Sequence, residues 1–127
     1  MFPKLVPGIE KSLETTVAAG MLATAYCSGT LDVLATPSMI ALMEQTALES
    51  VEPVLPEGMT TVGTEVRVKH LRATPIGKWI TCHSVLESVN GRELTFSVTA
   101  SDETGVIGTG THIRFIVDIQ RFLDKIS

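Results

Sequence analysis

An acidic side chain interrupts an apolar pattern near the middle of the chain. Residues 34–53, LATPSMIALMEQTALESVEP, have the apolar spacing of a helix, and Glu44 lies inside it. The residues three and four positions away from Glu44 are all apolar, namely Ile40, Ala41, Ala47 and Leu48. Removing a carboxylate from water is costly unless a partner, a water or a substrate compensates it. Glu44 is therefore a candidate general base or nucleophile, and the alternative is a structural acid paired with an arginine or a backbone group.

A histidine stands where it could assist such an acid. His70 ends the alternating stretch VGTEVRVKH (62–70) on the face of Val66 and Val68, whereas Gly63 falls on the opposite face. A histidine at a strand end can exchange protons with a carboxylate that lies close to it. The alternative is a rim residue whose hydrogen bonds are already satisfied.

Thr36 lies at the expected start of the helix. It is an N-cap residue type and Pro37 suits the first helical position, so capping alone would explain it. Eight residues, which correspond to about 12 Å of helix rise, separate Thr36 from Glu44. The two can act together only through a substrate, a non-helical start or a second subunit.

Other candidate motifs favour structural roles. The GTGTH segment (108–112) enters a strand rather than a helix, so it does not fit a phosphate loop, and its glycines are expected to allow curvature or close packing. His83 and His112 have no metal-ligand spacing with each other or with a cysteine, so they are expected at the surface or rim, and no metal site is predicted. Ser38 and Ser84 lack the context of a catalytic nucleophile.

The remaining patterns define the elements that must position these residues. The helix is expected to bury one apolar stripe made of Ile40, Met43, Ala47, Leu48 and Val51. Strands are expected over residues 12–17, 62–70, 79–89, 92–101 and 106–119. The last strand is expected to place on one face Ile107, Thr109, Thr111, Ile113, Phe115 and Val117. Asn90-Gly91 indicates a hairpin, residues 19–33 are expected to form a loop or short helix, and residues 120–127 a short helical tail.

One apolar helix followed by four strands with tight connections predicts an α+β fold. An antiparallel sheet wrapped around one central helix satisfies both the strand order and the apolar helix, and this is the hotdog architecture. Such a sheet has an exposed edge, so we expect a homodimer, with further association into a tetramer left open.

Composition limits the classes of partner. The chain has 127 residues, 44% of them hydrophobic, which suits a single domain over residues 1–127. Its net charge is −4 and it has no basic run, so no nucleic-acid partner is expected. No apolar run is long enough to span a membrane, and MFPKLVPGIEK lacks the apolar core of a signal peptide. Cys27 and Cys82 are expected to be reduced, buried thiols of a cytoplasmic protein, with a disulfide as the alternative.

Four segments of the chain resemble a known family. From about Pro7 to Lys125 the sequence is similar to hotdog-fold acyl-CoA thioesterases, in particular the fluoroacetyl-CoA thioesterase-like group. The resemblance is carried by TPSMIALMEQ, VGTEVRVKHLRATPIG, NGRELTFSVTA and GTGTHIRF. It implies hydrolysis of an acyl-CoA thioester at a dimer interface, with no cofactor beyond the coenzyme A of the substrate. A non-catalytic hotdog protein that binds acyl-CoA or another small ligand is the alternative.

The resemblance also implies roles for individual residues. Thr36, Glu44 and His70 correspond to the catalytic set, and Gly63 to a glycine whose N–H could stabilise an oxyanion. Arg114 corresponds to a substrate-binding arginine, although strand alternation places it opposite the face of Ile113 and Phe115. The segment LATAYCSGTLDVLA (residues 22–35) is shorter than the lid of the fluoroacetyl-specific enzyme and has no phenylalanine. We therefore expect a different short or medium acyl group, or a broad range.

Overall fold

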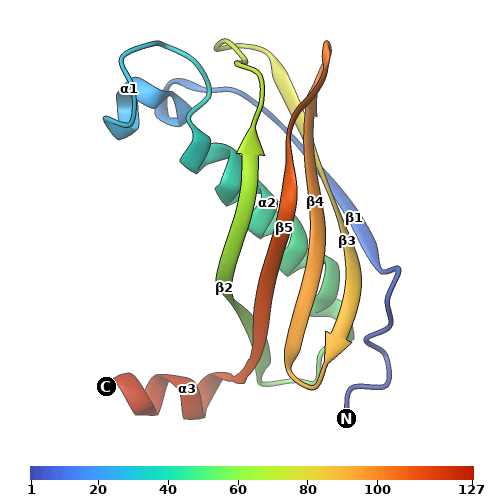
Figure 1. The fold of residues 1–127 in the computed structure, drawn as a ribbon. Coiled ribbons are helices and arrows are strands. Elements are labelled where there is room, and N and C mark those ends of the chain that lie inside the picture. Colours follow the sequence, from blue (N-terminus) through green and yellow to red (C-terminus); the bar gives the residue numbers. More distant parts are fainter.

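A single curved sheet holds the long helix of the protein. A computed structural model describes all 127 residues. Five antiparallel strands lie in the order β1-β3-β4-β5-β2, with bounds β1 Glu10–Thr16, β2 Met59–His70, β3 Trp79–Asn90, β4 Glu93–Asp102 and β5 Gly105–Asp118. Helix α2, Thr36–Val51, packs against one face of this sheet (Figure 1). The predicted α+β fold, an antiparallel sheet around one central helix, is confirmed.

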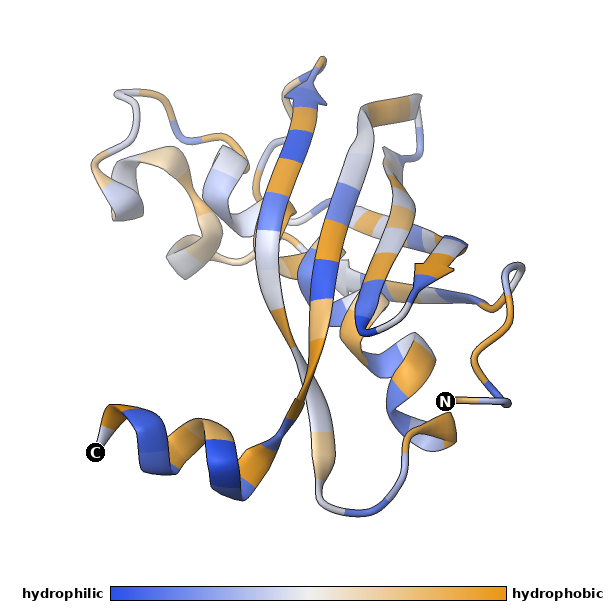
Figure 2. Ribbon diagram, turned by 60° about the horizontal axis from the view of Figure 1, so that its bottom comes forward, coloured by the Kyte–Doolittle hydropathy of each residue, from blue (hydrophilic) through white to orange (hydrophobic).

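Short helical segments complete the chain. They are η1 Ala19–Met21, α1 Ala23–Tyr26, η2 Glu52–Val54 and α3 Ile119–Ile126. The first two fall in the segment expected to be a loop or short helix, and α3 is the expected helical tail. Figure 2 shows α3 standing away from the sheet, with apolar and polar bands along it. None of the helices has the length and hydropathy needed to cross a membrane.

The buried face of α2 differs from the expected stripe. Its buried residues are Ser38, Met39, Leu42, Met43, Thr46, Ala47 and Val51. Ile40 and Leu48 are only half-buried, and the side chain of Glu44 between them is 41% exposed. The helix is apolar over most of its circumference, so its pattern does not distinguish the face that the sheet covers. Glu44 therefore lies at the margin of the core and not inside it.

The sheet faces depend on two irregularities in strand pairing. In β4 the predicted inward residues Leu94, Phe96, Val98 and Ala100 are all buried, as expected. In β5 the prediction that Ile107 shares a face with Thr109 and the alternate residues after it is wrong. A bulge at Ala100 and Ser101 of β4 shifts the pairing with β5 next to Ile107. The β5 residues buried toward α2 are Ile107, Gly108, His112, Arg114 and Ile116.

A second bulge changes the face of Gly63. The register of β2 against β5 shifts between Gly63 and Glu65, so Gly63 lies opposite Arg114 and Val66 lies opposite His112. Directly paired residues share a sheet face. Gly63 and the later inward residues of β2 therefore share one face, contrary to the simple alternation expected over residues 62–70.

Of two smaller expectations, one is wrong and one is confirmed. Cys82 is buried, but Cys27 is exposed, and both are free thiols. The expected burial of Cys27 is therefore wrong. The glycines of the GTGTH segment serve close packing, as expected: a Cβ on Gly108 would lie 2.5 Å from Sδ of Met39 on α2, and one on Gly110 would collide with the backbone of β2.

Candidate active site

Thr36 and His70 form a direct pair at one end of the sheet. The Oγ1 atom of Thr36 lies 2.8 Å from Nδ1 of His70, at the end of β2. Thr36 is the first residue of α2 rather than its N-cap, a position that Ala35 occupies without a side-chain hydrogen bond. The predicted capping role is therefore wrong, and the hydroxyl group is available to the histidine.

The environment of His70 favours its neutral form. Burial lowers the pKa of His70 below 6.5, and this effect outweighs the nearby backbone of Arg72, which raises it. Its Nε2 atom is buried and has no hydrogen-bond partner. A neutral imidazole can accept a proton at physiological pH.

A cavity of about 260 Å³ adjoins this pair. Besides Thr36 and His70, it is lined by Ala23, Ser28, Val33, Leu34, Leu71, Arg72 and Ala73. Four of these residues come from the segment 22–35, which the resemblance identifies with a lid. The cavity has space for a small group beside the histidine.

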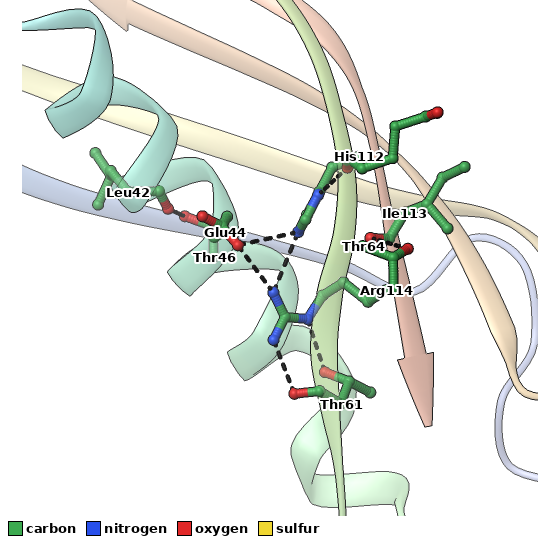
Figure 3. Close-up of polar contacts among 9 residues, drawn as sticks. Leu42, Glu44, Thr46, Thr61, Thr64, His112, Ile113 and Arg114 are labelled. Carbon is green, nitrogen blue, oxygen red and sulfur yellow. Dashed lines mark hydrogen bonds and ion pairs between the residues drawn. The ribbon is translucent and has the colours of Figure 1, made fainter. Parts of the chain in front are cut away.

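Glu44 faces a second polar group farther along α2 (Figure 3). Its Oε2 atom lies 3.6 Å from Nη1 of Arg114 and 4.0 Å from Nε2 of His112. Arg114 is buried and donates from Nε to Oγ1 of Thr61 at 2.7 Å and from Nη2 to the Thr61 carbonyl at 2.9 Å. Burial lowers the pKa of Arg114, and the carboxylate of Glu44 counteracts this effect. Arginine nevertheless remains charged in proteins because its ordinary pKa is so high.

Arg114 lies opposite Ile113 and Phe115, as the alternation predicted, but its face is the inner one. Ile113 is half-buried and Phe115 is 40% exposed on the outer face. The arginine therefore points toward α2 and Glu44.

Gly63 completes the group around Glu44. A Cβ atom at this position would lie 2.5 Å from Oε2 of Glu44 and 3.3 Å from Nη1 of Arg114. Only a glycine leaves room for the carboxylate as it stands. Gly63 is also exposed, so its backbone borders the carboxylate on a surface that a ligand can reach.

Within one chain the predicted site residues form two separate groups. Thr36 touches His70, and Glu44 lies with Gly63 and Arg114, but α2 is continuous from Thr36 to Val51. The helix rise of about 12 Å keeps Thr36 and Glu44 apart. A non-helical start, one of the three expected ways to bring them together, is thereby excluded.

His112 belongs to this site although its sequence position did not reveal it. It is 1% exposed, so the expected surface or rim location is wrong. Its Nδ1 atom lies 2.8 Å from the Glu65 carbonyl, and its Nε2 atom lies 3.2 Å from Nη1 of Arg114. No three His, Cys, Asp or Glu side chains of the protein lie close enough together to hold a metal ion.

Known proteins share this fold and much of this sequence. Residues 17–120 match the model of a family described as fluoroacetyl-CoA-specific thioesterase. The chain is 38% identical over 95 residues to the fluoroacetyl-CoA thioesterase of Streptantibioticus cattleyicolor, an alignment that covers 75% of this chain and 68% of that protein. A solved structure of the fluoroacetyl-CoA thioesterase FlK superposes with a TM-score of 0.89 at 30% identity, covering 96% of this chain and 95% of the other.

More distant structures agree on the fold. A hot-dog-like protein from Thermanaerovibrio acidaminovorans superposes with a TM-score of 0.87 at 23% identity, over 94% of this chain and 89% of its own. The hotdog architecture is thus shared beyond close relatives. Because the family model spans residues 17–120, which include both groups of the candidate site, the chain belongs to the fluoroacetyl-CoA-specific thioesterase family.

Proposed function

We propose that this protein hydrolyses an acyl-CoA thioester to a free acid and coenzyme A. The observation that carries the proposal is the carboxylate of Glu44, which lies 3.6 Å from Arg114 and against the bare backbone of Gly63. An acid, a cation and an exposed glycine at one point suit attack on a carbonyl and stabilisation of the resulting oxyanion. Membership of a thioesterase family supports the same reaction.

We further propose that the active site is completed across a homodimer. Strand β2 is an edge of the sheet, and all of its residues from Gly63 to His70 are exposed or half-exposed. If two β2 edges pair antiparallel about a two-fold axis near Val66 and Arg67, His70 of one subunit lies opposite the partner's Gly63. The Thr36–His70 pair of one subunit would then meet the Glu44 group of the other. A tetramer made from two such dimers is compatible with this arrangement.

The proposed reaction proceeds by attack at the thioester carbonyl. Glu44 either removes a proton from the attacking water or attacks directly to form an anhydride that water then opens. Arg114 and the Gly63 N–H stabilise the negative charge on the carbonyl oxygen as the new C–O bond forms. The C–S bond then breaks and coenzyme A leaves as a thiolate. Neutral His70, oriented by Thr36, relays the proton that the thiolate finally takes up.

The acyl group is proposed to be short or medium and different from fluoroacetyl. The segment 22–35 borders the cavity beside His70 and contributes Ala23, Ser28, Val33 and Leu34 there, but it holds no phenylalanine. These small and aliphatic side chains leave the cavity without an aromatic wall that would grip one very small acyl group. A cytoplasmic location, where acyl-CoA substrates and free thiols occur, is part of the same proposal.

The test is release of free coenzyme A from a panel of acyl-CoAs. The panel runs from acetyl and fluoroacetyl to branched, aromatic and medium-chain acyl groups. Glu44→Gln should lower kcat by at least about 1000-fold, since it removes the base or nucleophile while keeping the shape of the side chain. Glu49→Gln is the matched control, because Glu49 lies on the same helix and its carboxylate accepts a hydrogen bond from Gln45 rather than facing Arg114. Equal turnover by Glu44→Gln and wild type would refute the mechanism, and binding of acyl-CoA without any turnover would instead support a binding module.

A further inference from the structure

His112 is a buried histidine that the proposed reaction does not yet use. It lies on β5 between Arg114 and the backbone of β2, and it faces the carboxylate of Glu44 at 4.0 Å (Figure 3). It cannot itself reach solvent, since only 1% of the residue is exposed. Any effect on the reaction would therefore act through its neighbours.

The neighbours of His112 determine which ring nitrogen carries the proton. Nδ1 lies 2.8 Å from the carbonyl oxygen of Glu65, which can only accept a hydrogen bond. Nε2 lies 3.2 Å from Nη1 of Arg114, which can only donate. Both bonds form together only in the neutral tautomer with its proton on Nδ1. Burial is the largest influence on the pKa of His112 and, together with the charge of Arg114, lowers it below 6.5. The bond to the Glu65 carbonyl and the charge of Glu44 oppose this shift but are outweighed, so the neutral state is favoured.

This tautomer fixes the second side of the Arg114 guanidinium. Thr61 holds one side through bonds from Nε and Nη2, as described above. Nη1, the nitrogen nearest Glu44, is held on the protein side only by Nε2 of His112. Because the guanidinium is one rigid plane, Nη1 turns away from the carboxylate and from the backbone of Gly63 only when the bonds to Thr61 also break, and the bond to His112 opposes that movement from the Nη1 side.

The imidazole ring is itself held in place. It stacks on Phe96 of β4 with ring centroids 6.3 Å apart and an interplanar angle of 30°. The bond to the Glu65 carbonyl ties it to the residue that follows the β2 bulge. One side chain thus connects the bulge, the arginine and the helix acid.

We infer that His112 is a positioning residue for the proposed thioester hydrolysis: as an Nδ1-protonated neutral imidazole, it orients Arg114 toward Glu44 and the substrate carbonyl. This inference rests on the proposed function. It assigns no proton transfer to His112, because neither nitrogen is free to exchange a proton with the substrate. The acceptor at the Nε2 position is the feature that matters, and the aromatic shape alone is insufficient.

Four variants separate the acceptor from the rest of the side chain: His112→Gln, His112→Asn, Arg114→Met and the double variant of the last two. His112→Gln can place an amide oxygen near the Nε2 position and keep the bond from Arg114, whereas His112→Asn can retain only the bond to the Glu65 carbonyl. We expect His112→Gln to keep kcat within about threefold of wild type, and His112→Asn to lower kcat about 10- to 100-fold with little change in KM. In an Arg114→Met background, His112→Asn should cause no further loss of kcat.

An equal loss in the Gln and Asn variants, or additive losses in the double variant, would overturn the inference. Because these variants could unfold, the tautomer is also measured directly in the wild-type protein by ¹⁵N NMR of its histidines. A proton on Nδ1 of His112 near pH 7 supports the inference, and a proton on Nε2 or on both nitrogens contradicts it. If wild type releases no coenzyme A from any acyl-CoA, the proposed function fails, and the NMR result still decides the orientation of the His112–Arg114 pair.

Discussion

Replacing Gly63 with alanine would place a methyl group where the Glu44 carboxylate lies. The new Cβ atom would stand 2.5 Å from Oε2 of Glu44, and ordinary contacts begin at 3.4 Å, so the carboxylate must move by about 0.9 Å. The contacts to His112 and Arg114, at 3.1 and 3.3 Å, require smaller shifts of a few tenths of an ångström. A displacement of a reacting group by about 1 Å can reduce the rate about 100-fold, which corresponds to about 2.7 kcal/mol of activation free energy.

The same substitution should affect folding much less than catalysis. The side chain of Glu44 is 41% exposed and can rotate toward solvent, so we expect the free energy of unfolding to fall by about 1 kcal/mol or less. The assay compares kcat/KM on the best acyl-CoA with the urea unfolding midpoint. Gly20→Ala is the matched control, because a Cβ there meets no atom within 4 Å. Activity of Gly63→Ala within threefold of wild type would refute the close placement of Gly63 and the reacting carboxylate.

Two further predictions concern pH and packing. Because the pKa of His70 is lowered, its neutral form is present above pH 6.5 and is lost only as the pH falls through the lowered pKa. The acid limb of kcat/KM should therefore have its midpoint below pH 6.5. A midpoint above pH 6.5 would contradict the role of neutral His70. Gly110→Ala would press a Cβ against the backbone of Arg67 and Val68, which cannot rotate away. Thermal unfolding should therefore show that the free energy of unfolding falls by about 1–3 kcal/mol. An unchanged melting temperature would contradict the close approach of β2 and β5.

The sequence predicts most of the fold because its local signals are strong. Proline and glycine residues mark the ends of α2, and Asn90-Gly91 occupies the β3–β4 hairpin as expected. Regular alternation located all five strands to within a few residues. These signals depend on residues close together in the sequence, so they can be recognised without knowledge of the tertiary structure.

The faces of β2 and β5 could not be predicted in the same way. Each depends on a bulge, and a single extra residue reverses the side of the sheet on which every later side chain lies. Hydrophobicity also misleads in β5, since charged Arg114 lies inside while Phe115 is 40% exposed. A buried polar site inverts the pattern that normally marks a core-facing strand.

A usable signal for His112 was nonetheless present in the GTGTH segment. Gly108 and Gly110 are four and two residues before His112, respectively, and each glycine lies where a Cβ would collide with a neighbour. Once the glycines are assigned to the crowded inner face, a period of two places His112 and Arg114 on that face as well. Interpreting glycines as markers of close approach would therefore have found both residues.

The division of the site into two groups is a consequence of the tertiary structure. Thr36 and Glu44 are separated by about two turns of one rigid helix, so no local rearrangement of α2 brings them together. His70 and Gly63 lie at opposite ends of the exposed part of β2. An antiparallel pairing of two such edges offers a direct way to unite the groups.

Complementation between two inactive variants tests the shared site most directly. Glu44→Gln and His70→Ala are each expected to be inactive, but in a mixed dimer one site would combine an intact Glu44 with an intact His70 from the other subunit. Random mixing of equal amounts makes half of the dimers mixed, each with one working site of two, so the activity should return to about a quarter of wild type. Release of coenzyme A from an acyl-CoA at that level is the predicted result. Activity that stays at background after subunit exchange, while wild type is active, would contradict a site built from two subunits.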